Sequence, residues 1–77
     1  MTKFKQLLLN KGIKQDWVAR QAKVSKDTVS LWARGLSSPT LKHKIRLAKI
    51  LGVPLKQINN IFFEDAVQAT VNSEHMP

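Results

Sequence analysis

The stretch VSKDTVSLWARG, residues 24–35, decides the fold. Val29, Trp32 and Ala33 recur at three- and four-residue spacing, which is typical of a short helix with one buried side. Ser25 suits a helix N-terminus and Gly35 suits the position just after a helix, so the pattern predicts a helix over residues 26–33. The opposite face of this helix carries Lys26, Asp27, Ser30, Leu31 and Arg34. That face is either plain surface or a contact surface, and the rest of the chain bears on the choice.

A second short helix precedes this one. Val18, Ala19 and Ala22 form an apolar stripe that predicts a helix over residues 15–23. Only three residues separate Ala22 from Lys26, so the two helices must cross steeply. This is the geometry of a helix-turn-helix.

Three more helices are predicted around this pair. Thr2 can cap a helix that ends near Asn10, before Gly12. Thr40 can cap another helix that reaches Leu51, whose predicted apolar stripe is Leu41, Ile45, Ala48 and Leu51. Pro54 can open a last helix over residues 55–61. We therefore expect an all-α fold of five short helices.

The apolar pattern fades after Phe63. The segment EDAVQATVNSEHMP is polar and weakly periodic. We expect one domain over residues 1–62 and a flexible tail over residues 63–77. A short strand around residues 66–71 is the competing interpretation, because apolar and polar residues alternate there.

Charge is the strongest compositional signal, with a net value of +8. All 13 Lys and Arg residues lie between Lys3 and Lys56, where only Asp16 and Asp27 oppose them, so this region carries +11. Such self-repulsion is commonly tolerated for a polyanionic partner, and a merely solvating surface is the alternative.

Composition narrows the function classes further. The 77 residues allow one domain, and the absence of cysteine excludes disulfides and thiolate metal sites. His43 and His75 have no companions at ligand spacing, and no side-chain set is arranged for catalysis. No apolar run approaches the length of a membrane span. We expect a cytoplasmic protein with no enzymatic activity, no metal, no cofactor and no membrane partner.

Residues 14–55, KQDWVARQAKVSKDTVSLWARGLSSPTLKHKIRLAKILGVPL, resemble the Cro/phage-repressor family of helix-turn-helix DNA-binding domains. The resemblance extends over about Phe4 to Ile61. Gln15 matches the first motif residue, Ala19 the small residue between the helices and Val24 the apolar turn residue. The family implies a lambda-repressor-like domain, here followed by the flexible tail.

The sequence departs from the family pattern at three places. Lys23 stands where Gly is usual in the turn, and at positive φ it would be strained unless the turn adjusts. Ala33 replaces a common Glu, and Leu8 occupies the position that would pair with it. Pro54 stands where a capping Ser is frequent. None of these changes lies on the face implied to contact DNA.

The resemblance implies that the N-terminal part of the 26–33 helix enters the major groove. It places five residues toward the bases: Ser25, Lys26, Asp27, Ser30 and Leu31. Lys can donate to guanine, Asp can accept from cytosine, and Leu can pack on a thymine methyl group. For Asp27 the alternative is an acid favoured by the helix dipole, and for Leu31 it is a core position.

A second set is assigned to the DNA backbone: Lys14, Gln15, Arg34, Lys42 and Lys44. Lys26, Lys42 and Lys44 lie near helix N-termini, where a cation opposes the helix dipole unless phosphate binds there too. Ordinary surface lysine is the alternative for each. Trp32 is interpreted as core, whereas the role of Trp17 is left open.

We expect the protein to bind a double-stranded, palindromic DNA operator as a small repressor or Cro-like regulator. One such domain contacts only a few base pairs, so we expect the protein to bind as a homodimer. This homodimer forms either in solution or only on DNA. The apolar residues beyond the motif are the candidate dimer contact: Ile58, Ile61, Phe62 and Phe63.

Other classes of function remain as alternatives. An antitoxin-like or antirepressor helix-turn-helix protein would act mainly through a protein partner. A basic RNA-binding or membrane-surface peptide would need exposed aromatic residues or a continuous amphipathic helix. The sequence favours neither the RNA-binding peptide nor the membrane-surface peptide.

Overall fold

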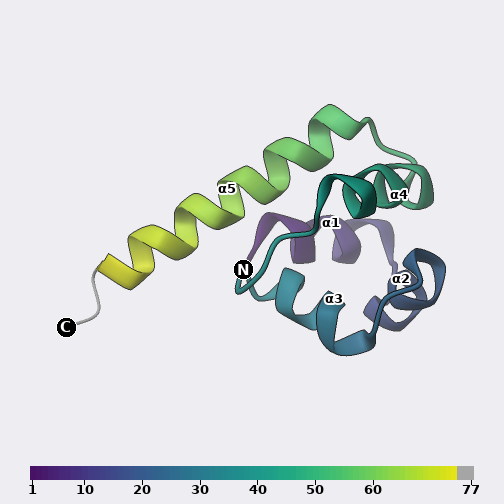
Figure 1. Ribbon diagram of the computed structural model, residues 1–77, viewed down its shortest axis with the longest axis horizontal. Helices are drawn as coiled ribbons and strands as arrows, with labels where there is room; N and C mark the ends of the chain where they lie inside the picture. The colour runs from purple at the N-terminus through teal and green to yellow at the C-terminus, as the bar shows by residue number, and fades with distance from the viewer. Residues whose placement is uncertain (75–77) are drawn as a thin grey trace.

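The computed structural model describes the backbone of residues 1–74 and the side chains of residues 1–70. Within residues 1–74 it contains five helices and no strand (Figure 1): α1 (Lys3–Lys11), α2 (Gln15–Ala22), α3 (Lys26–Ala33), α4 (Leu41–Leu51) and α5 (Leu55–Glu74). The expected all-α class is confirmed, and the bounds of α3 are those predicted.

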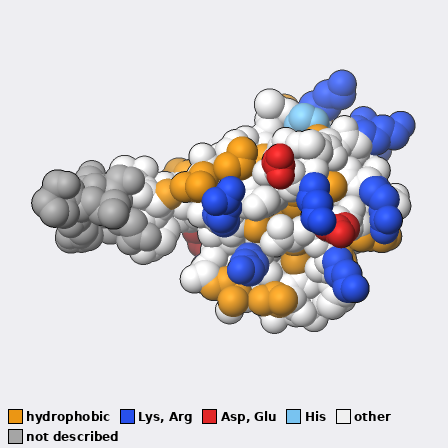
Figure 2. All heavy atoms as spheres, turned by 90° about the horizontal axis from the view of Figure 1, so that it is seen from below, with side chains coloured by type: hydrophobic (Ala, Val, Ile, Leu, Met, Phe, Trp, Pro, Cys, Tyr) orange, Lys and Arg blue, Asp and Glu red, His pale blue; other side chains and the backbone are white. Residues whose placement is uncertain are grey.

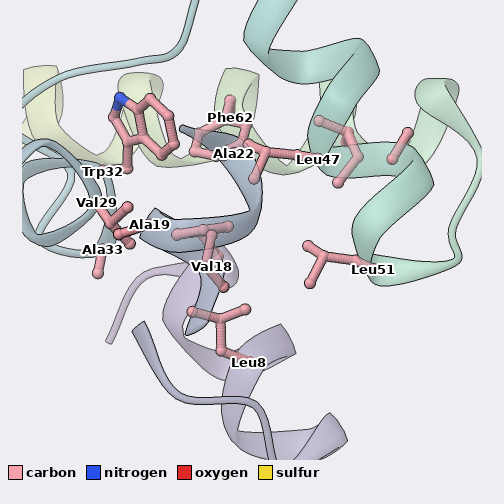
Figure 3. Close-up of a cluster of buried hydrophobic side chains, with 13 residues drawn as sticks. Leu8, Val18, Ala19, Ala22, Val29, Trp32, Ala33, Leu47, Leu51 and Phe62 are labelled. Atoms are coloured by element: carbon pink, nitrogen blue, oxygen red, sulfur yellow. The ribbon is translucent and has the colours of Figure 1, made fainter. Parts of the chain in front are cut away.

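Aromatic side chains from three helices form the centre of the core. Phe4 of α1 and Phe62 of α5 have ring centroids 5.0 Å apart, and Trp32 of α3 lies 6.4 Å from each of them. Trp32 is only 2% exposed, which confirms it as a core residue. Figure 3 shows it beside Phe62, with Val29 on the same helix. Since each ring comes from a different helix, the cluster fixes α3 relative to α1 and α5.

The buried face of α4 differs from the predicted one. Leu47, Ala48 and Leu51 are buried, whereas Leu41 is 60% exposed and Ile45 is 41% exposed. The helix packs mainly on α2 and α5, and its buried residues lie in its C-terminal turns. The prediction of Leu41 and Ile45 as core residues was therefore wrong.

The last helix is longer than predicted, because α5 continues to Glu74, and the strand considered around residues 66–71 is contradicted. The domain boundary after residue 62 and the flexibility of the segment beyond it stay predictions. The remaining residues, 75–77, lie outside the described part of the chain, and with them His75. Phe62 is buried, and one turn further the buried Asp65 carboxylate accepts hydrogen bonds from the backbone N–H groups of Lys3 (2.6 Å) and Phe4 (3.1 Å). This contact anchors the helix past the predicted boundary, and Figure 1 shows its second half extending beyond the bundle. A strand has no neighbouring strand here with which to pair.

The turn between α2 and α3 keeps the left-handed conformation although it lacks glycine. Lys23 has φ 58° and ψ 44°, and its N–H donates to the carbonyl of Ala19. The turn therefore does not adjust to the larger residue, and the strain stays at Lys23.

Candidate nucleic-acid interface

The α2–α3 pair is packed on its inner side and open on its outer side. Val18 and Ala22 of α2 and Val29 of α3 are fully buried. The N–H of Val24 closes the turn on the carbonyl of Ala19 at 3.1 Å. Arg46 of α4 donates to the carbonyl of Ala22 at 3.0 Å, so α4 also satisfies the C-terminal end of α2. These contacts present α3 as a rigid element.

Ser25 caps the N-terminus of α3. Its Oγ accepts from the N–H of Thr28 at 3.1 Å and lies 2.8 Å from the Thr28 hydroxyl. Both contacts of the Ser25 hydroxyl are therefore made with Thr28, in the first turn of the same helix. Thr28 was not among the residues predicted from the sequence, and it lacks the Glu or Gln side chain that would mark a capping box three positions after Ser25.

An ion pair joins the N-terminal ends of α2 and α3. The Nζ of Lys26 lies 3.2 Å from Oδ1 of Asp16, and both side chains remain mostly exposed. Lys14 and Gln15 immediately precede Asp16, so they lie at the same end as Ser25 and Lys26. Figure 2 views this side of the molecule and shows basic side chains spread over it with acidic ones between them.

The outer face of α3 carries the remaining residues predicted to contact bases. Lys26 and Asp27 are exposed, and Ser30 and Leu31 are half-buried. Leu31 lies outside the core cluster. The structure thus places these side chains on one accessible face, while their contact with bases stays a prediction.

The residues predicted to contact the DNA backbone divide into two groups. Lys14 and Gln15 lie at the N-terminal end of α2, whereas Arg34 follows the C-terminus of α3. The Nε of Arg34 is 3.4 Å from the carbonyl of Ser30. Since eight helical residues span about 12 Å, these groups lie at opposite ends of the outer face.

The N-terminus of α4 belongs to the second group. Lys42 and Lys44 lie in its first turn; Lys42 is exposed and Lys44 is half-buried. The Nδ1 of His43 lies 3.2 Å from the Thr40 hydroxyl, and its ring packs 5.8 Å from Trp32. The histidine therefore fixes the start of α4 against α3.

Two of the four predicted dimer residues are core residues. Ile58 is fully buried and Phe62 is 2% exposed, so neither can contact a second chain without unfolding, and their assignment is corrected. Ile61 is half-buried against the core. Phe63 is 69% exposed, and Val67, which was not predicted, is 46% exposed. The four apolar residues did not by themselves show which side of α5 faces inward.

Sequence reasoning also missed Arg46 and Asp65, which hold helix ends in place. Asp65 follows Ile58 and Phe62 at seven- and three-residue intervals, so the helical spacing was a signal for a shared inner face. Arg46 gave no local signal, because its partner lies 24 residues earlier.

Within the described residues, no group of three or more His, Asp or Glu side chains is placed to hold a metal ion. Among residues 1–74, none of the helices combines the length and apolar character needed to cross a membrane.

A sequence model of the helix-turn-helix family matches residues 4–58, which include α1 to α4 and the start of α5. The chain belongs to this family, of the Cro/C1 type, whose members are DNA-binding regulators. No curated protein and no solved structure gave a significant match.

Proposed function

We propose that the protein is a small transcriptional regulator, a repressor or Cro-like protein, that binds a specific double-stranded DNA operator. The observation that supports this best is the α2–α3 pair. Its inner side is fixed in the core, while its outer side presents Lys26, Asp27 and Leu31 within a region of net charge +11. An accessible helix on a rigid support can enter the major groove in one orientation.

In this proposal the N-terminal part of α3 contacts the bases. Lys26 donates to guanine O6 and N7, Asp27 accepts from cytosine N4, and Leu31 packs on a thymine methyl group. Ser25 and Ser30 lie beside them as hydroxyl donors. Because Ser25 also caps α3, we assign it a contact made from a fixed position.

The DNA backbone lies against both ends of α3. Lys14 and Gln15 approach phosphate at the N-terminus of α2, where unpaired N–H groups favour an anion. Arg34, Lys42 and Lys44 approach the backbone at the far end. No side-chain cap bond satisfies the first N–H groups of α2 or α4, which leaves them available for phosphate.

We further propose that the protein binds as a homodimer, stable in solution or only on DNA. A single domain of this kind buries about 600–1,000 Å² on DNA, which is small for a specific regulator. The exposed Phe63 and Val67 of α5, with Met1 nearby at a surface hollow of about 840 Å³, supply an apolar surface for the contact. A palindromic operator would match the two-fold axis of such a dimer.

A selection from random DNA duplexes tests the proposal. We expect enrichment of one palindromic sequence, and tighter binding to it than to bulk DNA, to RNA and to anionic vesicles. Equal binding to all duplexes would contradict it. That result would favour the second candidate, an antitoxin-like or antirepressor protein that binds a protein partner through the exposed α5 surface. In either case we propose a cytoplasmic location, and for the regulator an association with the nucleoid.

A further inference from the structure

Asp16 of α2 forms an ion pair with Lys26, one of the residues of α3 predicted to contact bases. Within the part of the chain whose side chains are described, its pair with Lys26 is the one ion pair between side chains. Asp27 follows Lys26 directly in sequence, yet Lys26 pairs with Asp16 on the other helix. The acid that holds Lys26 thus belongs to the element that also carries Lys14 and Gln15.

The position of Lys26 is unfavourable without such a partner. Its ammonium lies at the N-terminus of α3, where the helix dipole repels a cation. A free lysine stem is flexible and can turn toward any phosphate within reach. The Asp16 carboxylate attracts the ammonium, which offsets its repulsion by the helix dipole. The carboxylate also repels phosphate, which keeps the ammonium from turning toward it.

The ion pair leaves Lys26 able to contact a base. An ammonium has three N–H donors, and one bond to Asp16 leaves two for the O6 and N7 atoms of a guanine. The Lys26 side chain is 72% exposed, so its free donors are accessible to DNA.

We propose that Asp16 is a positioning residue that sets the sequence specificity of Lys26. Asp16 holds the Lys26 ammonium over the base edges. It also weakens the attraction between phosphate and the N-terminal ends of α2 and α3, so that DNA sites without the matching base are bound less tightly. This inference rests on the proposed function, because it requires that Lys26 contacts a base.

Asp16→Asn tests the inference on two duplexes. One is the selected operator, and the other is the same operator with a single base pair changed. The changed base pair is the one whose identity the Lys26→Ala protein no longer distinguishes. We expect the preference between them to fall about two- to fivefold, which is the scale of an exposed ion pair. Affinity for unrelated duplex should rise, and the salt dependence of binding should steepen by about one unit. Asp16→Glu should restore most of the preference.

Two controls separate positioning from stability and from total charge. Asp16 also lies in the first turn of α2, so its loss weakens a dipole interaction, but this affects both duplexes equally and leaves their ratio unchanged. Glu64→Gln makes the same charge change on an exposed part of α5 and should leave the preference intact.

The inference is overturned if Asp16→Asn keeps the preference of the parent protein, or if Glu64→Gln lowers that preference as much as Asp16→Asn does. Either result leaves the proposed function standing, because the parent still distinguishes the two duplexes. A parent protein that shows no preference among duplexes would overturn the proposed function and this inference together.

Discussion

Lys23 holds a left-handed backbone conformation that costs an L-residue with a Cβ atom about 1–2 kcal/mol. Among the described residues it is the one non-glycine residue with positive φ. Its side chain is exposed, so its replacement removes no core contact.

We expect Lys23→Gly to raise the free energy of unfolding by about 0.5–1 kcal/mol, because relief of strain exceeds the entropy that glycine adds to the unfolded chain. Urea unfolding of both proteins would measure the change. Gln21→Gly, within α2, is the matched control and should lower stability, since φ there is helical. A stability of Lys23→Gly at or below that of the parent would show that the turn is not strained.

Lys26 and Lys44 are predicted to contribute to DNA binding in different ways. Lys26→Ala should lower affinity by about 1–3 kcal/mol at one base pair in each half-site and relax the preference there. Lys44→Ala should weaken binding to all sequences alike and reduce the salt slope by about one unit. Titrations at several salt concentrations on matched and mismatched duplexes would separate the two. A sequence-dependent loss for Lys44→Ala would argue against its assignment to the DNA backbone.

At the scale of elements, helices whose signals are local were predicted best. The bounds of α3 follow from a capping serine, a stripe of three apolar residues and a terminal glycine, all within residues 24–35. The extent of α5 could not be predicted in this way. One of the contacts that hold the helix is made by the Asp65 carboxylate, which accepts hydrogen bonds from the N–H groups of Lys3 and Phe4, 62 and 61 positions earlier in the chain.

In the candidate site, too, features with local sequence signals were predicted and features that depend on contacts between helices were not. The side of α3 that faces outward followed from the positions of Val29 and Trp32, both of which are buried. The ion pair between Asp16 and Lys26 did not follow, because it depends on how two helices cross. The predicted α4 stripe was right only in its C-terminal half: Ala48 and Leu51 are buried, whereas Leu41 and Ile45 are exposed, because the extent of burial depends on where α2 and α5 contact the helix.

Asp65 provides the test of α5 as a structural element. Asp65→Ala leaves the N–H groups of Lys3 and Phe4 without their acceptor, and we expect a loss of about 1–3 kcal/mol in unfolding free energy. Thermal and urea unfolding would measure it. Glu64→Ala, at the exposed neighbouring position, should change stability by less than about 0.5 kcal/mol. Equal stability of both variants would mean that the contact with α1 does not stabilise the fold.

At the scale of the whole molecule, the proposed dimer surface lies on α5, and the hollow beside it is also lined by Arg34, which is predicted to contact the DNA backbone. The described residues measure 39 × 24 × 23 Å, and the long axis follows the extension of α5 away from the bundle (Figure 1). The basic region ends at Lys56, near the start of α5, and the later helix carries Glu64 and Asp65. Asp65 is buried, so among the described side chains of this half of α5 the exposed Glu64 is the acidic one, beside the exposed Phe63 and Val67. These two apolar side chains are the reason to propose a protein contact here.

Truncation after Asn60 would be a poor test of the dimer contact. It would remove Phe62, which is part of the aromatic core, and Asp65, which caps α1. Loss of binding would then report unfolding. Substitution at Phe63 avoids this problem, because its side chain is 69% exposed.

We expect Phe63→Ser to keep the stability of the parent protein and its affinity for a single half-site, while lowering both the affinity and the steepness of binding to a full palindrome. The reason is that two half-sites about 34–36 Å apart bind cooperatively only if the two copies touch. Band-shift titrations on half-site and full-site duplexes, with sedimentation of the free protein, would measure these effects. Leu9→Ser, an equally apolar and exposed change on α1, should leave the cooperativity intact. If Phe63→Ser binds the palindrome as tightly and as steeply as the parent, the dimer contact lies elsewhere, and the half-exposed Trp17 of α2 is the next residue to substitute.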